Sequence, residues 1–130
     1  MKAVTTAIIQ SGESFLIARR APGEKLAGFW EFPGGKLEPN ETLQECLERE
    51  LKEELGLTVR AGDVITESVY HYEHGSINLV AISASIVEGE IRLSVHDEVE
   101  WLPIDKIIGL NLAPADIPIA QRLKDIFYGL

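Results

Sequence analysis

The chain has 130 residues, which fits one domain, and 45% of them are hydrophobic, enough for a packed core. Its 21 acidic and 12 basic residues give a net charge of −9, so we expect no long nucleic acid as a partner, because a phosphate backbone needs a basic surface. Cys46 is the one cysteine, which excludes an internal disulfide. The chain opens with no signal-peptide pattern and contains no run near the ~20 apolar residues of a membrane helix. We therefore expect a cytoplasmic protein without a membrane partner.

Strand and helix patterns alternate along the chain. Runs rich in β-branched and aromatic residues predict strands, with weaker signals in the last two, at residues 3–10, 15–19, 29–32, 64–72, 77–87, 91–93 and 98–102. Pro33-Gly34-Gly35 is expected to break regular structure after the third of them. Helices are predicted at 42–55 and 114–128. This order predicts a single α/β domain over residues 1–130.

The helix expected at 42–55 has the clearest ends. Thr42 is followed three residues later by Glu45, the pattern of a capping box, and Gly56 stands where helices commonly stop. At about 100° per residue, its leucines form one apolar stripe, and Glu45, Glu48 and Lys52 lie opposite. This opposite face is expected to be solvated.

Glu50 and Glu54 do not join that solvated face. They fall inside the apolar stripe, and Glu53 lies at its edge. Like charges at these spacings destabilise a helix by about 0.2–0.5 kcal/mol per pair, and burying them costs more unless they are paired. Two explanations remain open from the residues alone, namely a hard divalent cation such as Mg²⁺ and a network of basic side chains that includes Arg49.

The residues around this helix resemble a known motif. Five residues separate Gly35 from Glu41, seven more precede Arg49-Glu50-Leu51, and Glu53-Glu54 and Gly56-Leu57 follow at fixed spacing. This spacing matches the box of the Nudix hydrolase family, which the chain resembles. The resemblance implies an α/β/α sandwich with a mixed β-sheet between helices.

The resemblance also implies roles for individual residues. Glu50, Glu53 and Glu54, with Gly35, match the positions that hold Mg²⁺ or Mn²⁺, and Arg49 matches the arginine that orients the glutamates. Glu41, Gly34 and Gly56 match supporting positions of the box. The chemistry implied is hydrolysis of a nucleoside diphosphate linked to another group, with a small nucleotide as the partner.

A finer resemblance lies outside the box. Residues 28–36 and 112–118 are similar to the MutT-type branch, and the second segment is most similar to its CTP pyrophosphohydrolases. Members that hydrolyse 8-oxo-dGTP tend to have asparagine where this chain has Asp116. An ionised carboxylate only accepts hydrogen bonds, which suits the amino group of cytosine. The alternative for Asp116 is a plain residue of a helix N-terminus.

Further site residues are predicted from position and charge. The resemblance implies a further catalytic glutamate from outside the box in this region, and Glu98 and Glu100, two apart on an expected strand, share one face, so either could be the additional ligand or general base. The alternative is an exposed acidic turn. Arg20 and Lys36 are candidate phosphate contacts, with a plain surface position as the alternative for each.

These observations favour a metal-dependent nucleoside triphosphate pyrophosphohydrolase acting on (d)CTP or on modified or oxidised dNTPs. The alternatives are a hydrolase of ADP-ribose or a nucleotide sugar, and a domain of the same fold that senses nucleotides without catalysis. Retention of every box glutamate argues against the sensor. We expect a monomer or a homodimer.

Overall fold

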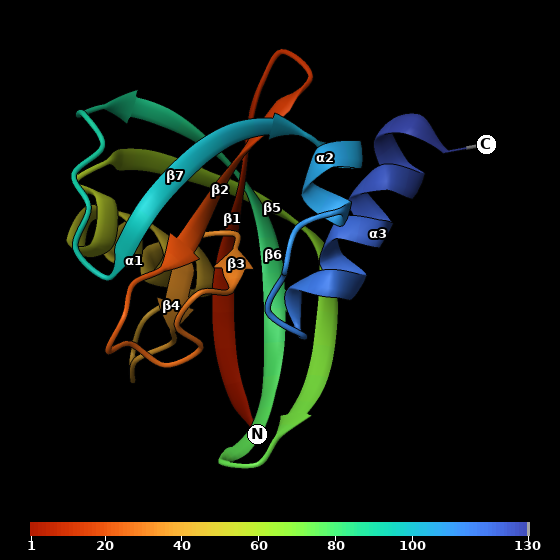
Figure 1. The fold of residues 1–130 in the computed structure, drawn as a ribbon. Helices are drawn as coiled ribbons and strands as arrows, with labels where there is room; N and C mark the ends of the chain where they lie inside the picture. The colour runs from red at the N-terminus through yellow and green to blue at the C-terminus, as the bar shows by residue number, and fades with distance from the viewer. Residues whose placement is uncertain (130) are drawn as a thin grey trace.

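The computed structural model describes residues 1–129, which form a curved sheet with helices on both sides (Figure 1). The elements, in chain order, are β1 (Lys2–Ser11), β2 (Ser14–Arg20), β3 (Trp30–Glu31), β4 (Gly34–Lys36), α1 (Leu43–Leu55), β5 (Thr58–Tyr72), β6 (Gly75–Glu88), β7 (His96–Pro103), α2 (Ile104–Ile108) and α3 (Asp116–Tyr128).

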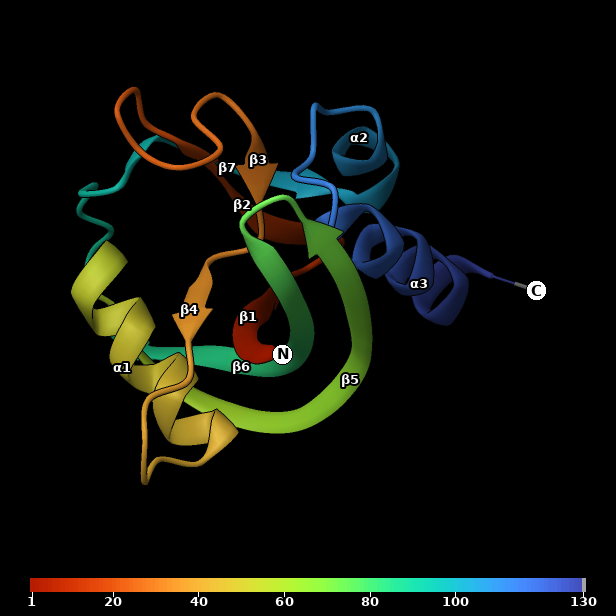
Figure 2. The same ribbon diagram turned by 90° about the horizontal axis from the view of Figure 1, so that it is seen from below.

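The sheet is mixed. Its strands follow the order β3-β2-β1-β6-β5, with β4 paired to β1 and β7 paired to β2. β1 runs parallel to β6, and the other strand pairings are antiparallel. Figures 1 and 2 show α1 on one side of the sheet and α2 with α3 on the other. The expected α/β/α sandwich is confirmed.

Alternating strand residues fill two separate cores, one under each helical layer. On β2, Phe15 and Ile17 pack on the side of α2 and α3, whereas Leu16 between them packs against α1. Leu47, Leu51 and Leu55 of the α1 stripe are fully buried in the second core, as the periodicity predicts, and Leu43 packs against this core partly buried. Because both faces are covered, the central strands read as continuous apolar runs.

The ends of α1 agree with the sequence prediction. Thr42 accepts a hydrogen bond from the backbone N–H of Glu45, whose side chain accepts one from the N–H of Thr42. Gly56 adopts a left-handed conformation with φ of 70° and ends the helix. One part of the prediction is wrong, because Glu48 is half-buried rather than solvated, and its carboxylate accepts a hydrogen bond from the N–H of Ala61.

Other segments also differ from expectation, among them α2, a helix that was not predicted. β5 begins at Thr58, six residues before the predicted start at Val64, because register shifts along it disturb the alternation that marks a strand. Residues 91–93 are a loop, since this segment leaves the sheet at Gly89 and bonds instead to the end of α1. Gly34 and Gly35 do not break the sheet but pair with β1 as β4.

The described part of the chain contains no helix that is long and apolar enough to cross a membrane.

Candidate functional site

Arg49 holds three carboxylates of the site in one network. Its guanidinium lies 2.8 Å from Glu41, 2.8 Å from Glu50 and 3.3 Å from the more exposed Glu53. It also donates to the backbone oxygen of Lys36, which ties α1 to β4. This pairing lowers the pKa of Glu41 to about 2 and raises the pKa of Arg49. Arg49 therefore fixes Glu50 and Glu53, but it does not contact Glu54.

Gly35 makes room for one of these carboxylates. A Cβ atom at this position would collide with the side-chain carboxylate of Glu50. The carbonyl oxygen of Gly35 accepts a hydrogen bond from Thr5 Oγ1 at 3.2 Å, with Cys46 Sγ at 3.6 Å. Gly34 is equally confined, because a Cβ there would meet the backbone of Thr5. The absence of a side chain at Gly35 is therefore what lets Glu50 lie against the strand.

Glu54 is the least neutralised carboxylate of the helix. Burial, followed by the nearby charge of Glu31 and then that of Glu50, raises the pKa of Glu54 to about 8. Its Oε1 is buried and has no hydrogen-bond partner within residues 1–129. Burial also raises the pKa of Glu50, although Arg49 opposes that shift. Crowded carboxylates with an unsatisfied oxygen fit a divalent cation, which prefers oxygen ligands.

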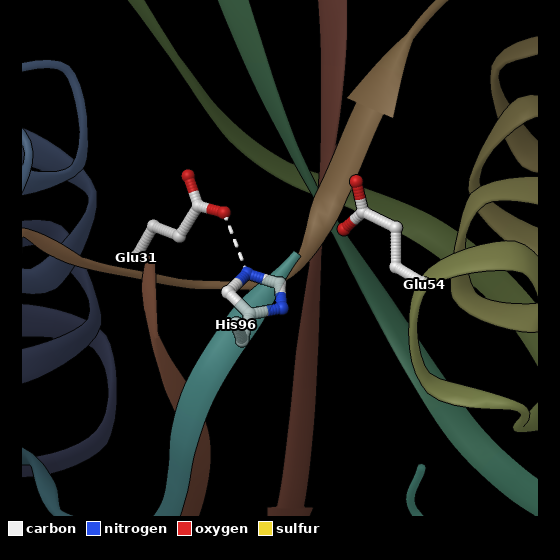
Figure 3. A group of neighbouring side chains, drawn as sticks. All are labelled: Glu31, Glu54 and His96. Carbon is white, nitrogen blue, oxygen red and sulfur yellow. Dashed lines mark hydrogen bonds and ion pairs between the residues drawn. The ribbon is translucent and has the colours of Figure 1, made fainter. Parts of the chain in front are cut away.

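A histidine from β7 and a glutamate from β3 face Glu54. Figure 3 shows the ring of His96 between the carboxylates of Glu31 and Glu54. Nε2 of His96 lies 2.9 Å from Oε2 of Glu31, and one ligand atom from each of the three side chains lies within 4.8 Å of the others. Arg20 also bonds Oε2 of Glu31, at 3.2 Å. Neither Glu31 nor His96 was predicted from the sequence as a site residue.

A β-bulge explains why Glu98 and Glu100 do not lie in this group. Arg20 pairs with His96 but Arg19 pairs with Glu98, so Asp97 is an extra residue in β7. Glu98 and Glu100 therefore lie on the sheet face opposite to His96. Glu98 lies 3.4 Å from Arg19, and the side chain of Glu100 is exposed.

A cavity of about 610 Å³ opens beside the helix glutamates. Glu50 and Glu54 line one part of it, and Arg20, Lys36 and Lys2 line another. The side chain of Arg20 is half-buried and paired with Glu24 and Glu31, whereas Lys36 is exposed. Carboxylates and cations thus border the same space, as the binding of a metal–phosphate group requires.

A smaller cavity of about 170 Å³ adjoins it, since Arg20 and Lys36 line both. Asp116 at the start of α3 is 5% exposed and lines this cavity together with Tyr72 and Glu31. Its Oδ1 accepts a hydrogen bond from the backbone N–H of Phe32 at 3.0 Å. Asp116 makes no capping bond to its own helix, so its contacts differ from those of a plain helix-start residue.

The sequence-based prediction treats Asp116 as an ionised carboxylate, and the structure differs on this point. Burial, and after it the charge of Glu31, raises the pKa of Asp116 well above its ordinary value. This shift favours the neutral acid, which offers one O–H donor in addition to its acceptors. The carboxyl group is therefore not restricted to accepting hydrogen bonds.

The chain is similar to known nucleotide hydrolases over most of its length. A family model described as the NUDIX domain matches residues 1–124. The CTP pyrophosphohydrolase of Escherichia coli (strain K12) is 34% identical over 118 residues, which cover 91% of this chain and 87% of that protein. The 8-oxo-dGTP diphosphatase of the same organism is 32% identical over 120 residues, covering 90% and 91% respectively.

A solved structure shares the same architecture. The MutT protein from Methanosarcina mazei Go1 superposes with a TM-score of 0.88 at 27% sequence identity, covering 98% of this chain and 95% of that one.

Proposed function

The chain belongs to the NUDIX domain family, and we propose that it hydrolyses nucleoside triphosphates to the monophosphate and pyrophosphate with Mg²⁺ or Mn²⁺. The favoured substrates are (d)CTP and modified or oxidised dNTPs. Relatives of similar length that carry the names CTP pyrophosphohydrolase and 8-oxo-dGTP diphosphatase support this substrate class.

One observation carries the proposal, namely that Glu50 and Glu54 border the same cavity as Arg20 and Lys36. A triphosphate needs a cation to neutralise some of its oxygens. It also needs basic groups to contact the phosphates that lie away from that cation. The two kinds of group stand around one space, and the smaller cavity beside it offers a place for the base.

The cation would be held by Glu50, Glu53 and Glu54, and when bound it would polarise the phosphoryl oxygens and activate the attacking water. Arg49 would keep Glu50 and Glu53 oriented through the contacts described above, with Glu41 supporting the arginine from its other side. Gly35 would contribute the space for Glu50, and we leave its carbonyl as a candidate ligand. We place Glu98 and Glu100 outside the site because their sheet face is opposite to that of His96.

Arg20 and Lys36 would contact the phosphates, since both border the two cavities. Asp116 would contact the base, because it is a buried polar side chain in the wall of the smaller cavity. Tyr72 would form another part of that wall, with its hydroxyl fixed by the backbone N–H of Ala115 at 3.1 Å.

The test is a panel of nucleotides with Mg²⁺, scored separately for pyrophosphate and for phosphate. The panel contains dCTP, 5-methyl-dCTP, dGTP, 8-oxo-dGTP, ADP-ribose and a nucleotide sugar. We expect pyrophosphate release from a triphosphate and no turnover without a divalent cation. Release of single phosphates, faster turnover of ADP-ribose or the sugar, or binding without turnover would overturn the proposal.

A further inference from the structure

Leu26, in the loop between β2 and β3, has a backbone conformation that leucine rarely adopts. Its φ is 56°, in the left-handed region, where the Cβ atom of an L-residue comes close to the following carbonyl oxygen. The same loop places Gly23 and Gly28 at positive φ, and glycine adopts such angles without that contact. A third glycine would therefore suit the backbone better than leucine. The side chain of Leu26 calls for an explanation, since strained residues concentrate at binding sites.

The hydrophobic cores do not explain this leucine. Leu26 is half-buried, yet within the described residues it is not among the side chains that form either core or pack against one. It lines instead the smaller cavity of about 170 Å³, where Asp116 and Tyr72 form other parts of the wall. The apolar surface of Leu26 is therefore available to a molecule that occupies this cavity.

Hydrogen bonds hold the loop in this conformation. The Nε of Arg20 donates to the carbonyl oxygen of Lys25 at 3.1 Å, and the backbone oxygen of Arg20 accepts from the N–H of Gly28 at 2.9 Å. The carbonyl oxygen of Leu26 accepts from the N–H of Phe29 at 3.0 Å. Both peptide groups that flank Leu26 are thus bonded, so its side chain is positioned before a ligand binds, which favours binding.

We propose that Leu26 is a specificity-determining residue, whose side chain packs against the base of the nucleotide and limits the size of base that the smaller cavity accepts. The inference rests on the function proposed above, which assigns this cavity to the base. Ligand pockets combine apolar walls with a few polar groups, and here Asp116 supplies a polar group and Leu26 an apolar wall. Because a smaller residue would leave the cavity wider, leucine favours a pyrimidine over the larger purine.

Substitution of Leu26 by Ala and by Gly tests the inference through kinetics. Both changes remove the contact with the base, so we expect kcat/KM for dCTP to fall about tenfold or more, through KM rather than kcat. The loss should be smaller for dGTP, so the ratio of kcat/KM between dCTP and dGTP should fall. Leu93→Ala, at an exposed loop leucine outside both cavities, is the matched control and should keep the wild-type ratio.

Melting temperatures separate a role in binding from a role in the fold. Leu26→Gly relieves the left-handed conformation and Leu26→Ala keeps it, so the Gly variant should have the higher Tm and yet bind nucleotide no better. Leu47→Ala, at a fully buried leucine of the core, gives the fall in Tm that a core role would produce. A fall of that size in both Leu26 variants would assign Leu26 to the fold and overturn the inference.

Binding of dCMP without a divalent cation tests the contact independently of turnover. With ¹³C-labelled leucine methyl groups, we expect dCMP to shift the signals of Leu26 and to leave those of Leu93 unchanged. Such shifts in a protein that turns over no nucleotide would support the contact with the base and contradict only the proposed hydrolysis. Turnover with an unchanged ratio between dCTP and dGTP in both Leu26 variants, or Leu26 signals that dCMP does not move, would overturn the inference alone.

Discussion

The carboxylates of α1 and the polar groups of the opposite wall differ in how they are assembled. Glu50, Glu53 and Glu54 lie within two turns of one helix, and Arg49 beside them satisfies the first two. The opposite wall brings together Glu31, His96 and Asp116 from three distant segments. Local geometry therefore places one side of the site, and the register of the sheet places the other.

Charge compensation divides the site differently, because its less compensated carboxylates come from both sides. Arg49 neutralises the outer end of the helix cluster, whereas Glu54, Glu31 and Asp116 form an inner acidic group in which burial raises the pKa of both Glu54 and Asp116. The inner group is where a cation would relieve the most repulsion. Four predictions test this difference.

Glu54→Gln breaks the inner group most directly. It removes a charge proposed to bind the cation while keeping the size of the side chain, so we expect kcat to fall by at least ~10²-fold with the fold retained. Steady-state turnover and thermal melting measure the two effects. Glu88→Gln, at an exposed position, is the control. Near-normal turnover in Glu54→Gln would remove Glu54 from the proposed site.

Metal binding should stabilise the helix side. An ion that binds only the native state raises the free energy of unfolding by about 2.7 kcal/mol at 100 times its dissociation constant. Mg²⁺ or Mn²⁺ should therefore raise the Tm of the wild type, and replacing Glu50, Glu53 and Glu54 together by Gln should abolish the rise.

The matched control replaces three exposed glutamates, Glu13, Glu88 and Glu90, by Gln. It changes the net charge by the same amount as the site variant, and its Tm should still rise on addition of metal. A wild-type melting curve that does not respond to millimolar Mg²⁺ or Mn²⁺ would contradict a preformed cation site.

Asp116→Asn tests the opposite wall alone. A mispaired buried polar group costs about 1–3 kcal/mol, so the ratio of kcat/KM between cytosine and guanine nucleotides should change by roughly ten- to a hundredfold. At a pH at which Asp116 is ionised, the wild type should prefer cytosine nucleotides. This preference should narrow at lower pH, because the protonated carboxyl group of Asp116 gains an O–H donor.

The substitution should narrow or reverse the cytosine preference and leave the dependence on Mg²⁺ unchanged. The measurement is kcat/KM for dCTP, 5-methyl-dCTP, dGTP and 8-oxo-dGTP at two pH values in both proteins. Equal ratios in wild type and variant would show that Asp116 does not contact the base.

The raised pKa of Glu54 predicts how pH affects the metal-free protein. Its pKa rises from an ordinary 4.5 to about 8 on folding, so between these values the native state binds more protons than the unfolded state. The contribution of Glu54 to the free energy of unfolding is fully present below a pH of about 4.5 and is lost as the pH rises toward about 8. With a chelator present, the Tm of the wild type should therefore fall more steeply from pH 5 to 8 than that of Glu54→Gln. Parallel curves of Tm against pH for the two proteins would contradict the raised pKa of Glu54.

The contrast between the two sides explains what the sequence could predict. The capping box, the leucine stripe and the spacing of the glutamates are local patterns, and α1 has the predicted ends. His96 reaches the site only because a bulge at Asp97 shifts the register of β7, and no alternation pattern reveals that shift. β4 was missed for a similar reason, since its Gly34 and Gly35 are selected by close contact with Thr5 and Glu50 rather than by strand propensity.

Paramagnetic broadening by Mn²⁺ tests most directly whether the cation binds where the two sides meet. The backbone amide signals of ¹⁵N-labelled protein are followed while Mn²⁺ is added in substoichiometric steps. We expect the signals of Gly35, Glu50 and Glu54 to broaden first, while those of α3 beyond Ile119 persist. Broadening that starts instead at the exposed acidic residues Glu88 and Glu90 would contradict the proposed site.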